Sequence, residues 1–304
     1  MINVELKGGA VKEFENGTTP AEIAKSIGAG LYKSVCCAKV DGDLCDLRTP
    51  LEKDCKVELL TFDNVDGQKT FWHTASHVLA QAVKRLYPNA KCAIGPAVDN
   101  GFYYDFDVEK PFSPEDLEKI KAEMKKIVKS GLELERVELS PEEAEKKLEE
   151  MNEPYKVELV KEHSDKGEHI TFYKQGEFID LCAGPHLMSV APIKAIELTA
   201  CTGAYWRGDA NNAQLCRVYG VAFPKASMLE EHLKKLEEAK LRDHNKLGRE
   251  LEYFTTVDYV GQGLPILLPK GARVVQLLQR WVEDVEQSKG CLLTKTPLLA
   301  KRDL

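Results

Sequence analysis

Apolar and polar residues alternate along the start of the chain, as they do in half-buried β-strands. The alternation runs over residues 2–6, and after a Gly-Gly turn it returns over residues 11–14. Residues 35–40 and 55–60 have the same strand-like character. The pattern therefore predicts short strands on either side of a more polar segment.

One short helix is predicted among these strands. Thr19-Pro20-Ala21-Glu22 has the sequence of a capping box with proline at the first helical position, which predicts a helix that ends near Gly28. Strands arranged around a single helix are typical of a small β-grasp module. We place this module over residues 1–61.

Beyond this module the spacing of apolar residues changes to that of helices. The predicted elements are helices over residues 72–86 and after Ser113 and Ser140, and strands over residues 169–173 and 177–182. Each of the two serines is followed by proline, as at a helix N-terminus. Helices mixed with a hairpin of strands predict a larger α+β domain over residues 62–224.

Past Pro224 the chain becomes more charged. Leucines at helical spacing form one apolar stripe on a charged helix that we expect to reach about Lys246. A further helix is predicted over residues 272–287, followed by an extended stretch from Gly290 to Pro297. The overall class predicted for the chain is α+β.

The composition indicates a soluble globular protein of two or more domains. Of 304 residues, 43% are hydrophobic and 30% charged, and no apolar run approaches the roughly 18 residues that span a membrane. The N-terminus lacks the apolar core of a secretory signal peptide. Nine cysteines without a CxxC pair favour reduced thiols and a cytoplasmic location. The net charge of −7 weakens a nucleic-acid-binding function, although local patches decide such binding.

The strongest chemical signal is a pair of donor clusters. His73 and His77 are four residues apart and share one face of the predicted helix. Cys182 and His186 repeat that spacing. Three imidazoles and one thiolate suit zinc, while imidazoles also move protons near neutral pH. The residues alone leave open whether the clusters form a site or are incidental, and they lack the glutamate of HExxH proteases.

Other segments carry weaker signals. Gly95 and Pro96 read as a turn, and the aromatic run that contains Tyr104 is more typical of a buried strand than of a pocket. Lys156, taken alone, reads as a surface lysine. Neither a Walker A loop nor a GxGxxG motif is present.

Taken in order, the motifs resemble those of the N-terminal portion of bacterial-type threonyl-tRNA synthetases. The segments that carry the resemblance are His73-Thr-Ala-Ser-His77, Ala93-Ile-Gly-Pro96, Asp99-Asn-Gly-Phe-Tyr-Tyr-Asp105, Asp180-Leu-Cys-Ala-Gly-Pro-His186, Gly203-Ala-Tyr-Trp-Arg-Gly-Asp209, Arg242-Asp-His-Asn-Lys-Leu-Gly248 and Gly263-Leu-Pro-Ile-Leu-Leu-Pro-Lys-Gly271. The resemblance covers essentially the whole chain.

The resemblance implies a domain order. Residues 1–61 resemble the TGS module, a ubiquitin-like β-grasp, and residues 62–224 the editing domain that alanyl-tRNA synthetases share. Residues 225–242 resemble the linker helix, and residues 243–304 the start of the class II catalytic domain with its first motif. The later class II motifs and the anticodon-binding domain have no counterpart in the 304 residues. We therefore expect a fragment that does not itself activate threonine.

The resemblance also implies a reaction. Serine lacks one methyl group of threonine, and one such group is worth only roughly 1–3 kcal/mol of discrimination, so threonine activation needs a second site that hydrolyses seryl-tRNA(Thr). The implied catalytic residues are His73, His77, Lys156, Asp180, Cys182 and His186. His73 and Lys156 would position or activate the water, and Asp180 would pair with the substrate ammonium.

By the same resemblance, the serine pocket is shaped by Tyr104, Gly95 and Pro96, and the cleft is expected to work without a metal. Zinc at the four His and Cys donors stays an alternative, because the alanyl relatives use such a site for metal. A lysine ammonium aimed into the cleft would repel that cation. In the full-length family, zinc, ATP and Mg belong to the catalytic core.

Three other functions fit parts of the pattern: a standalone trans-editing deacylase, a non-catalytic tRNA-binding module and a metal-binding module. The partial catalytic segment argues against the first. The joint presence of four residues argues against the second: His73, Lys156, Asp180 and Cys182. The expected partners are tRNA(Thr), its mischarged seryl form and, in the full-length family, a second copy in a homodimer; no membrane is expected. The acidic balance predicts modest tRNA affinity.

Overall fold

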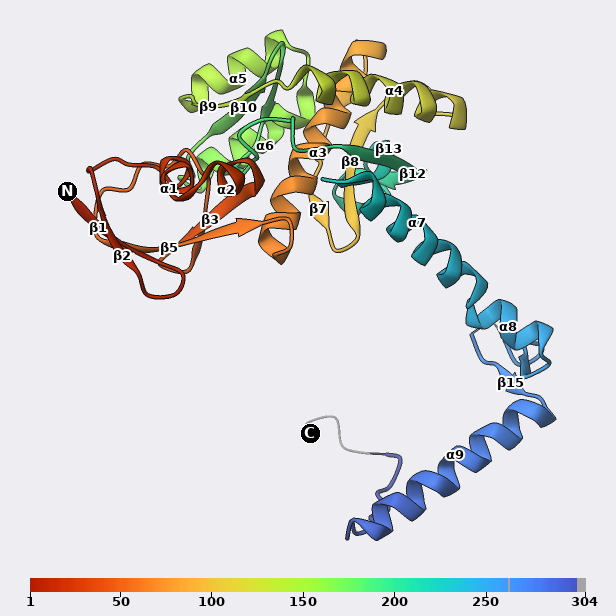
Figure 1. The fold of residues 1–304 in the computed structure, drawn as a ribbon. Helices are drawn as coiled ribbons and strands as arrows, with labels where there is room; N and C mark the ends of the chain where they lie inside the picture. The colour runs from red at the N-terminus through yellow and green to blue at the C-terminus, as the bar shows by residue number, and fades with distance from the viewer. Residues whose placement is uncertain (262, 300–304) are drawn as a thin grey trace. The chain divides into compact units, whose positions relative to one another are not determined.

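The computed structural model describes residues 1–261 and 263–299, and the chain divides into two compact units, Met1–Glu231 and His232–Leu304. Helices and mostly antiparallel strands are interspersed along both (Figure 1), which confirms the predicted α+β class. Residues 300–304 of the last predicted zone lie outside the described residues. No helix in the described part of the chain is both long and apolar enough to cross a membrane.

A five-stranded sheet opens the first unit. Its strands are β1 (Ile2–Leu6), β2 (Val11–Phe14), β3 (Val35–Val40), β4 (Asp43–Cys45) and β5 (Cys55–Thr61). They lie in the order β2-β1-β5-β3-β4, with β1 and β5 parallel and the other pairs antiparallel. The four strands predicted from the sequence are confirmed, and β4 is an addition.

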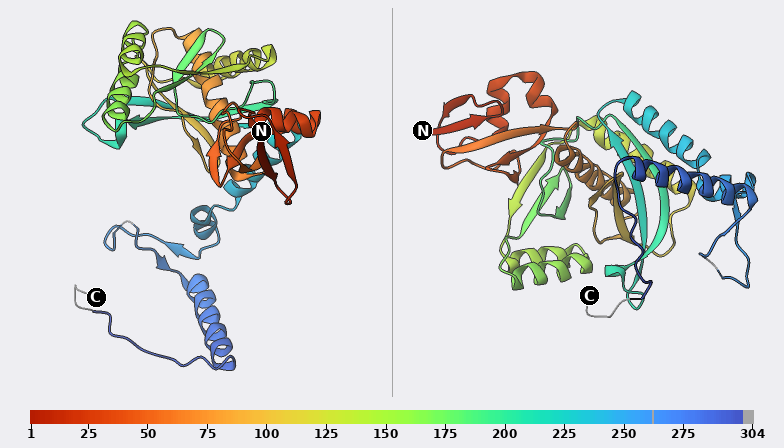
Figure 2. Two further views of the ribbon diagram at one scale, coloured as in Figure 1. Left: turned by 90° about the vertical axis from the view of Figure 1, so that its left-hand side faces the viewer. Right: turned by 90° about the horizontal axis from the view of Figure 1, so that it is seen from below.

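Helices α1 (Pro20–Ile27) and α2 (Ala29–Ser34) lie between β2 and β3. The predicted capping box forms: the Thr19 hydroxyl accepts from the Glu22 amide, and the Glu22 carboxylate accepts from the Thr19 amide. Ile23 points into a core with buried residues of the sheet. In Figure 1 and the right-hand view of Figure 2, this N-terminal module occupies one end of the first unit.

Helix α3 (Val65–Leu86) is the central helix of the first unit. It begins at Val65, earlier than the predicted start at residue 72. Its first turn is polar and contains Gly67, so the apolar period does not reveal it. Gly67 is required there because a Cβ would lie 2.0 Å from the Thr61 carbonyl oxygen.

A second sheet packs on α3. Its members are β6 (Lys91–Cys92), β7 (Ala97–Val98), β8 (Gly101–Asp107), β12 (Ala195–Tyr205) and β13 (Gln214–Phe223), with the short helix η1 (Trp206–Gly208) between the last two. The order is β12-β13-β8-β6, and β7 also pairs with β8. Helix α4 (Pro114–Ser130), capped by Ser113 as predicted, joins the same core.

A third, smaller sheet carries much of the site. It consists of β9 (Leu134–Glu138), β10 (Thr171–Gln175) and β11 (Phe178–Leu181), in the order β11-β10-β9. The predicted hairpin is thus confirmed as β10 and β11. Helices α5 (Pro141–Glu150) and α6 (Pro154–Asp165) pack on this sheet through a core of their own.

The prediction of one continuous helix to about Lys246 is wrong, because two helices occupy this stretch. Helix α7 (Ala226–Leu241) ends before Asp243, whose carboxylate accepts from the Lys246 amide at 2.8 Å and starts α8 (His244–Glu250). The second unit also contains strands β14 (Phe254–Thr255) and β15 (Ile266–Leu267) and helix α9 (Pro269–Ser288). The stretch predicted to be extended after Gly290 forms no strand among the described residues.

Candidate active site

A cavity of about 370 Å³ opens in the first unit where α3, α6 and the end of β11 meet. It is lined by most of the residues singled out from the sequence: His73, His77, Gly95, Pro96, Lys156, Asp180 and Cys182. His186 and Tyr104 are fully buried and lie in contact with this group rather than on the cavity wall. The structure therefore brings all nine predicted site residues together from separate segments.

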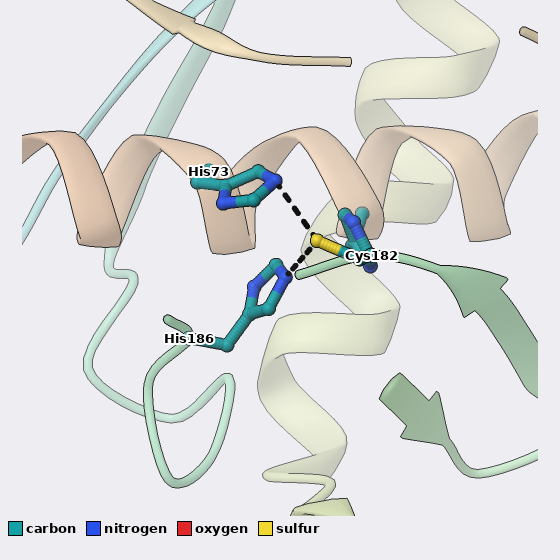
Figure 3. Close-up of side chains that lie close together, drawn as sticks. His73, Cys182 and His186 are labelled. Carbon is teal, nitrogen blue, oxygen red and sulfur yellow. Dashed lines mark hydrogen bonds between the residues drawn. The ribbon is translucent and has the colours of Figure 1, made fainter. Parts of the chain in front are cut away.

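The two donor clusters meet at the Cys182 sulfur. Figure 3 shows His73 on α3 and His186 on the loop after β11, each directed toward Cys182. Sγ lies 3.3 Å from His73 Nε2 and 3.2 Å from His186 Nε2, and it accepts from the Gly184 amide at 3.3 Å. The His77 ring packs 4.2 Å, centroid to centroid, from that of His186.

A threonine inside the first motif orients His186. Thr74 Oγ1 donates to the Thr70 carbonyl at 3.0 Å and accepts from the Leu187 amide at 3.0 Å. Its remaining lone pair faces His186 Nδ1 at 3.2 Å, so Nδ1 carries the ring proton. Nε2 of His186 then presents its lone pair to the Cys182 thiol. Thr74 lies within the His73–His77 motif, but nothing in the sequence indicates this role.

Desolvation keeps the imidazoles of His73 and His186 neutral. Desolvation lowers the pKa of His73 to about 4, against the opposing effect of the Asp180 carboxylate. Burial, followed by the neighbouring imidazoles of His77 and His73, lowers the pKa of His186 well below its usual value. Near pH 7 these rings are therefore proton acceptors rather than cations.

Lys156 and Asp180 form a buried ion pair. Their side chains are 5% and 4% exposed, and Lys156 Nζ lies 2.7 Å from Asp180 Oδ1. Burial opposes both charges, but mutual attraction outweighs it, raising the pKa of Lys156 and lowering that of Asp180. The reading of Lys156 as a surface lysine from residues alone is wrong, since helix α6 directs it inward.

The second oxygen of Asp180 is also occupied. It accepts from Tyr104 Oη at 2.6 Å and lies 3.7 Å from His77 Nε2. Tyr104 is part of strand β8 and is fully buried, as the core interpretation of its aromatic run predicted. Asp180 thus links the lysine, the tyrosine and one histidine of the site.

Gly95 separates Tyr104 from the cavity. A Cβ at Gly95 would lie 2.1 Å from the Tyr104 ring, so only glycine allows this approach. Ser76 Oγ lies 2.6 Å from the Gly95 carbonyl oxygen and 2.8 Å from that of His73, which ties the Gly95-Pro96 segment to α3. This segment forms no turn, so the turn predicted there is wrong. Ser76 is a further site residue that the sequence motif contained without indicating its task.

The four predicted donors also fit a metal ion by type and proximity. One ligating atom from each of His73, His77, Cys182 and His186 lies within 4.8 Å of all the others. Three imidazole nitrogens and one sulfur are a set that zinc accepts. The Lys156 ammonium lies on the same cavity wall and disfavours metal binding, because it would repel a cation.

Comparisons with known proteins agree with this geometry. Residues 2–61 match the family model "TGS domain", and residues 170–219 match "Threonyl and Alanyl tRNA synthetase second additional domain". The second match includes β10, β11 and the loop that carries Cys182 and His186.

Three bacterial proteins are similar to the chain along its whole length. The chain is 58% identical over 304 residues to a threonine–tRNA ligase of Clostridium perfringens and 57% to one of Clostridium botulinum, and in each case 100% of this chain aligns with 47% of the relative. Identity to the threonine–tRNA ligase of Acetivibrio thermocellus is 52%, covering 48% of that protein. The chain therefore spans about half the length of the curated relatives it matches.

Of the nine site residues, Asp180, Cys182 and His186 lie within the second family match, and all nine lie within the part of the chain that aligns with the whole-chain relatives. With matches to the TGS domain and to the second additional domain, and with similarity along its whole length, the chain is similar to the N-terminal part of bacterial threonine–tRNA ligases.

Proposed function

We propose that the first unit hydrolyses the ester bond of seryl-tRNA(Thr) and spares threonyl-tRNA(Thr). The observation that carries the proposal is the buried Lys156–Asp180 pair set beside neutral His73 in one cavity. A fixed positive charge next to a proton acceptor is what water attack on an ester requires. The match to the second additional domain of threonyl and alanyl tRNA synthetases supplies the substrate class.

In the proposed reaction, a water oxygen forms a bond to the ester carbonyl carbon. His73 accepts the water proton, since its lowered pKa leaves the ring neutral at pH 7. The tetrahedral intermediate then breaks the bond to the ribose oxygen, which takes that proton. The products are serine and a tRNA with a free terminal hydroxyl group.

Lys156 is proposed to stabilise the oxyanion rather than to act as a base. Its raised pKa keeps the ammonium charged, so it can donate but has no lone pair to accept a proton. Asp180 holds that ammonium in place at 2.7 Å. Since both Asp180 oxygens already have partners, pairing with the substrate ammonium is proposed only as a secondary role.

Gly95 and Pro96 are proposed to form the wall that rejects the extra methyl of threonine. Tyr104 lies directly behind Gly95, so this wall cannot yield without moving a fully buried ring. One methyl group inserted into a well-packed site costs about 1–3 kcal/mol, and this discrimination would add to the similar amount that the synthetic site supplies.

The experiment is hydrolysis of seryl and threonyl esters on the same threonine tRNA by residues 1–304. We expect fast loss of serine with threonine retained, and loss of this activity in His73→Ala and Lys156→Ala. Undiminished hydrolysis in either variant would remove that residue from the mechanism. Hydrolysis of neither ester, with tight tRNA binding, would favour a non-catalytic binding module.

A second candidate is a metal-dependent hydrolase, which the four clustered donors favour. His73, His77, Cys182 and His186 would hold the ion, and a bound metal would supply an activated water. We propose the metal-free reaction because Lys156 already provides the positive charge. Hydrolysis that a chelator abolishes and added zinc restores would overturn this choice.

The proposed reaction also indicates a binding partner and a cellular location. We infer tRNA(Thr) as the partner and the cytoplasm, where aminoacyl-tRNA is used, as the location. We propose a TGS module over residues 1–61 and an editing domain over residues 62–224. A linker helix over residues 225–242 and the start of a class II catalytic domain over residues 243–304 follow in the same proposal. Threonine ligation and a homodimer are proposed only for proteins with the full length of the relatives.

A further inference from the structure

The connection between β4 and β5 of the N-terminal module reaches the loop that carries His186. Arg48, in this connection, donates from Nη2 to the Leu187 carbonyl at 2.8 Å and from Nη1 to the His186 carbonyl at 3.4 Å. Its Nε donates to the Leu134 carbonyl at 3.0 Å. One guanidinium thus binds three backbone carbonyls of the editing-type domain.

Asp46 completes this contact from the other side. Its Oδ2 accepts from the His186 amide at 3.2 Å and from Tyr173 Oη at 2.8 Å. Both oxygens also accept from Arg48 Nη1, at 3.0 and 3.2 Å, so the two residues act as one rigid group. Asp46 is buried, and the Arg48 side chain is only 16% exposed.

The consequence for His186 is that its N–H and its C=O are both held by the N-terminal module. Its ring is then fixed by Thr74 at Nδ1, which leaves Nε2 facing Cys182. Tyr173 packs against the same loop, because its hydroxyl oxygen lies 2.3 Å from the place that a Cβ at Gly184 would take. The loop has partners on α3, on β10 and on the N-terminal module.

We propose that Asp46 and Arg48 are positioning residues for the candidate active site, acting through the backbone of His186. The inference rests on the proposed hydrolysis and adds to it: the N-terminal module becomes a structural part of the editing site. Without this contact, the His186 ring and the Cys182 sulfur would lose the alignment that the cavity depends on.

The contact depends on the guanidinium group of Arg48 and on the two carboxylate oxygens of Asp46. A lysine at position 48 has a single ammonium in place of a planar fork, so it cannot bind carbonyls of Leu134, His186 and Leu187 together. An asparagine at position 46 has one acceptor oxygen in place of two. Arg48→Lys and Asp46→Asn are therefore expected to behave like deletions of the contact while preserving size.

The first test is hydrogen exchange of the full chain, read on peptides that contain His186 and Leu187. Arg48→Ala, Arg48→Lys and Asp46→Asn should each raise exchange at the His186 amide about tenfold or more. Arg85→Ala is the matched control, since Arg85 pairs with Glu123 and Glu177 away from this loop. Exchange at His186 that is unchanged, or equally raised in the control, would overturn the proposal.

The second test is a double-mutant cycle on hydrolysis of seryl-tRNA(Thr) at saturating substrate. Arg48→Ala should lower kcat about tenfold or more with little change in KM, whereas Arg85→Ala should not. In a His186→Ala background, Arg48→Ala should have no further effect, because it acts through that residue. Multiplicative effects of the two substitutions would refute the positioning role.

The two tests separate the two proposals. If the wild-type chain hydrolyses neither ester, the proposed function fails, while the exchange measurement still decides whether Asp46 and Arg48 hold His186. If the wild type is active and the exchange and kcat of Arg48→Ala match those of the wild type, the proposed function stands and the positioning role is refuted. Thermal melting of each variant confirms that folded protein is compared.

Discussion

Lys156 is a buried ion-pair partner in the structure, although its local sequence is typical of a surface lysine. Its neighbours in sequence, Glu153-Pro154-Tyr155, give no sign that the side chain is buried. The stabilising partner is Asp180, which lies on another element and reaches Lys156 only when β11 pairs with β10. Burial of an ion pair depends on such distant contacts, so local sequence could not predict it. Only the family resemblance drew attention to this lysine.

The pair yields a prediction that separates structure from catalysis. Lys156→Met leaves the Asp180 carboxylate buried without its cation, and we expect unfolding free energy to fall by about 3–5 kcal/mol. Adding Asp180→Asn should restore more than half of that loss, but hydrolysis should stay absent in both variants. Urea denaturation and deacylation measure the two effects. Hydrolysis in the double variant would contradict the catalytic role.

His73 predicts a pH dependence of stability. Its folded-state pKa is about 4 and its unfolded value about 6.5, so the unfolded chain binds more protons between these pH values. Stability is therefore full above pH 6.5 and falls as the pH drops toward 4, by at most about 3 kcal/mol from this residue. His73→Asn should reduce the slope of stability against pH in that window and not above pH 7. Equal slopes in both proteins would contradict the pKa.

At the scale of elements, the sequence predicted best where a local signal exists. The capping boxes of α1, α4 and α5 all form, since each is made by residues three apart. Helix α6 and the long β12–β13 hairpin were not predicted. The N-cap of α6, Glu153, makes no capping hydrogen bond, because its carboxylate binds Lys84 and the Cys92 amide.

The Gly95-Pro96 segment leads to a prediction at this scale. Gly95→Ala would place a Cβ 2.1 Å from the Tyr104 ring, so the Gly95-Pro96 segment or the ring must shift. We expect a loss of about 1–3 kcal/mol in stability and a clear loss of serine-over-threonine selectivity. Gly30→Ala is the control, since no atom lies within 4 Å of its added Cβ. Unchanged selectivity in Gly95→Ala would show that this wall does not choose the substrate.

At the scale of the whole molecule, motifs and resemblance predicted the residues of the candidate site. They did not predict the residues of the N-terminal module that hold the site in place. All nine residues converge, yet the contact of Asp46 and Arg48 with His186 joins segments 140 and 138 residues apart in the chain. Neither residue belongs to a recognisable motif. Contacts between folded modules depend on surface complementarity, which no local pattern of apolar residues encodes.

Net charge makes a prediction for the whole chain. With 42 basic and 49 acidic residues, the protein should neutralise few tRNA phosphates. We expect modest affinity, with a log–log slope against salt shallower than about −3. Filter binding of threonine tRNA at salt concentrations from about 50 to about 200 mM measures this slope. A slope near −6 would show a concentrated basic surface that the overall charge conceals.

The most direct test of the account is the ratio of two rate constants. Seryl and threonyl esters of the same threonine tRNA are each mixed with excess protein, with and without chelator, and the first-order loss of each ester is followed. We expect the seryl ester to be hydrolysed at least about tenfold faster than the threonyl ester, as one methyl group can provide, and chelator to have no effect. Equal rates for the two esters, or no hydrolysis of either, would contradict it.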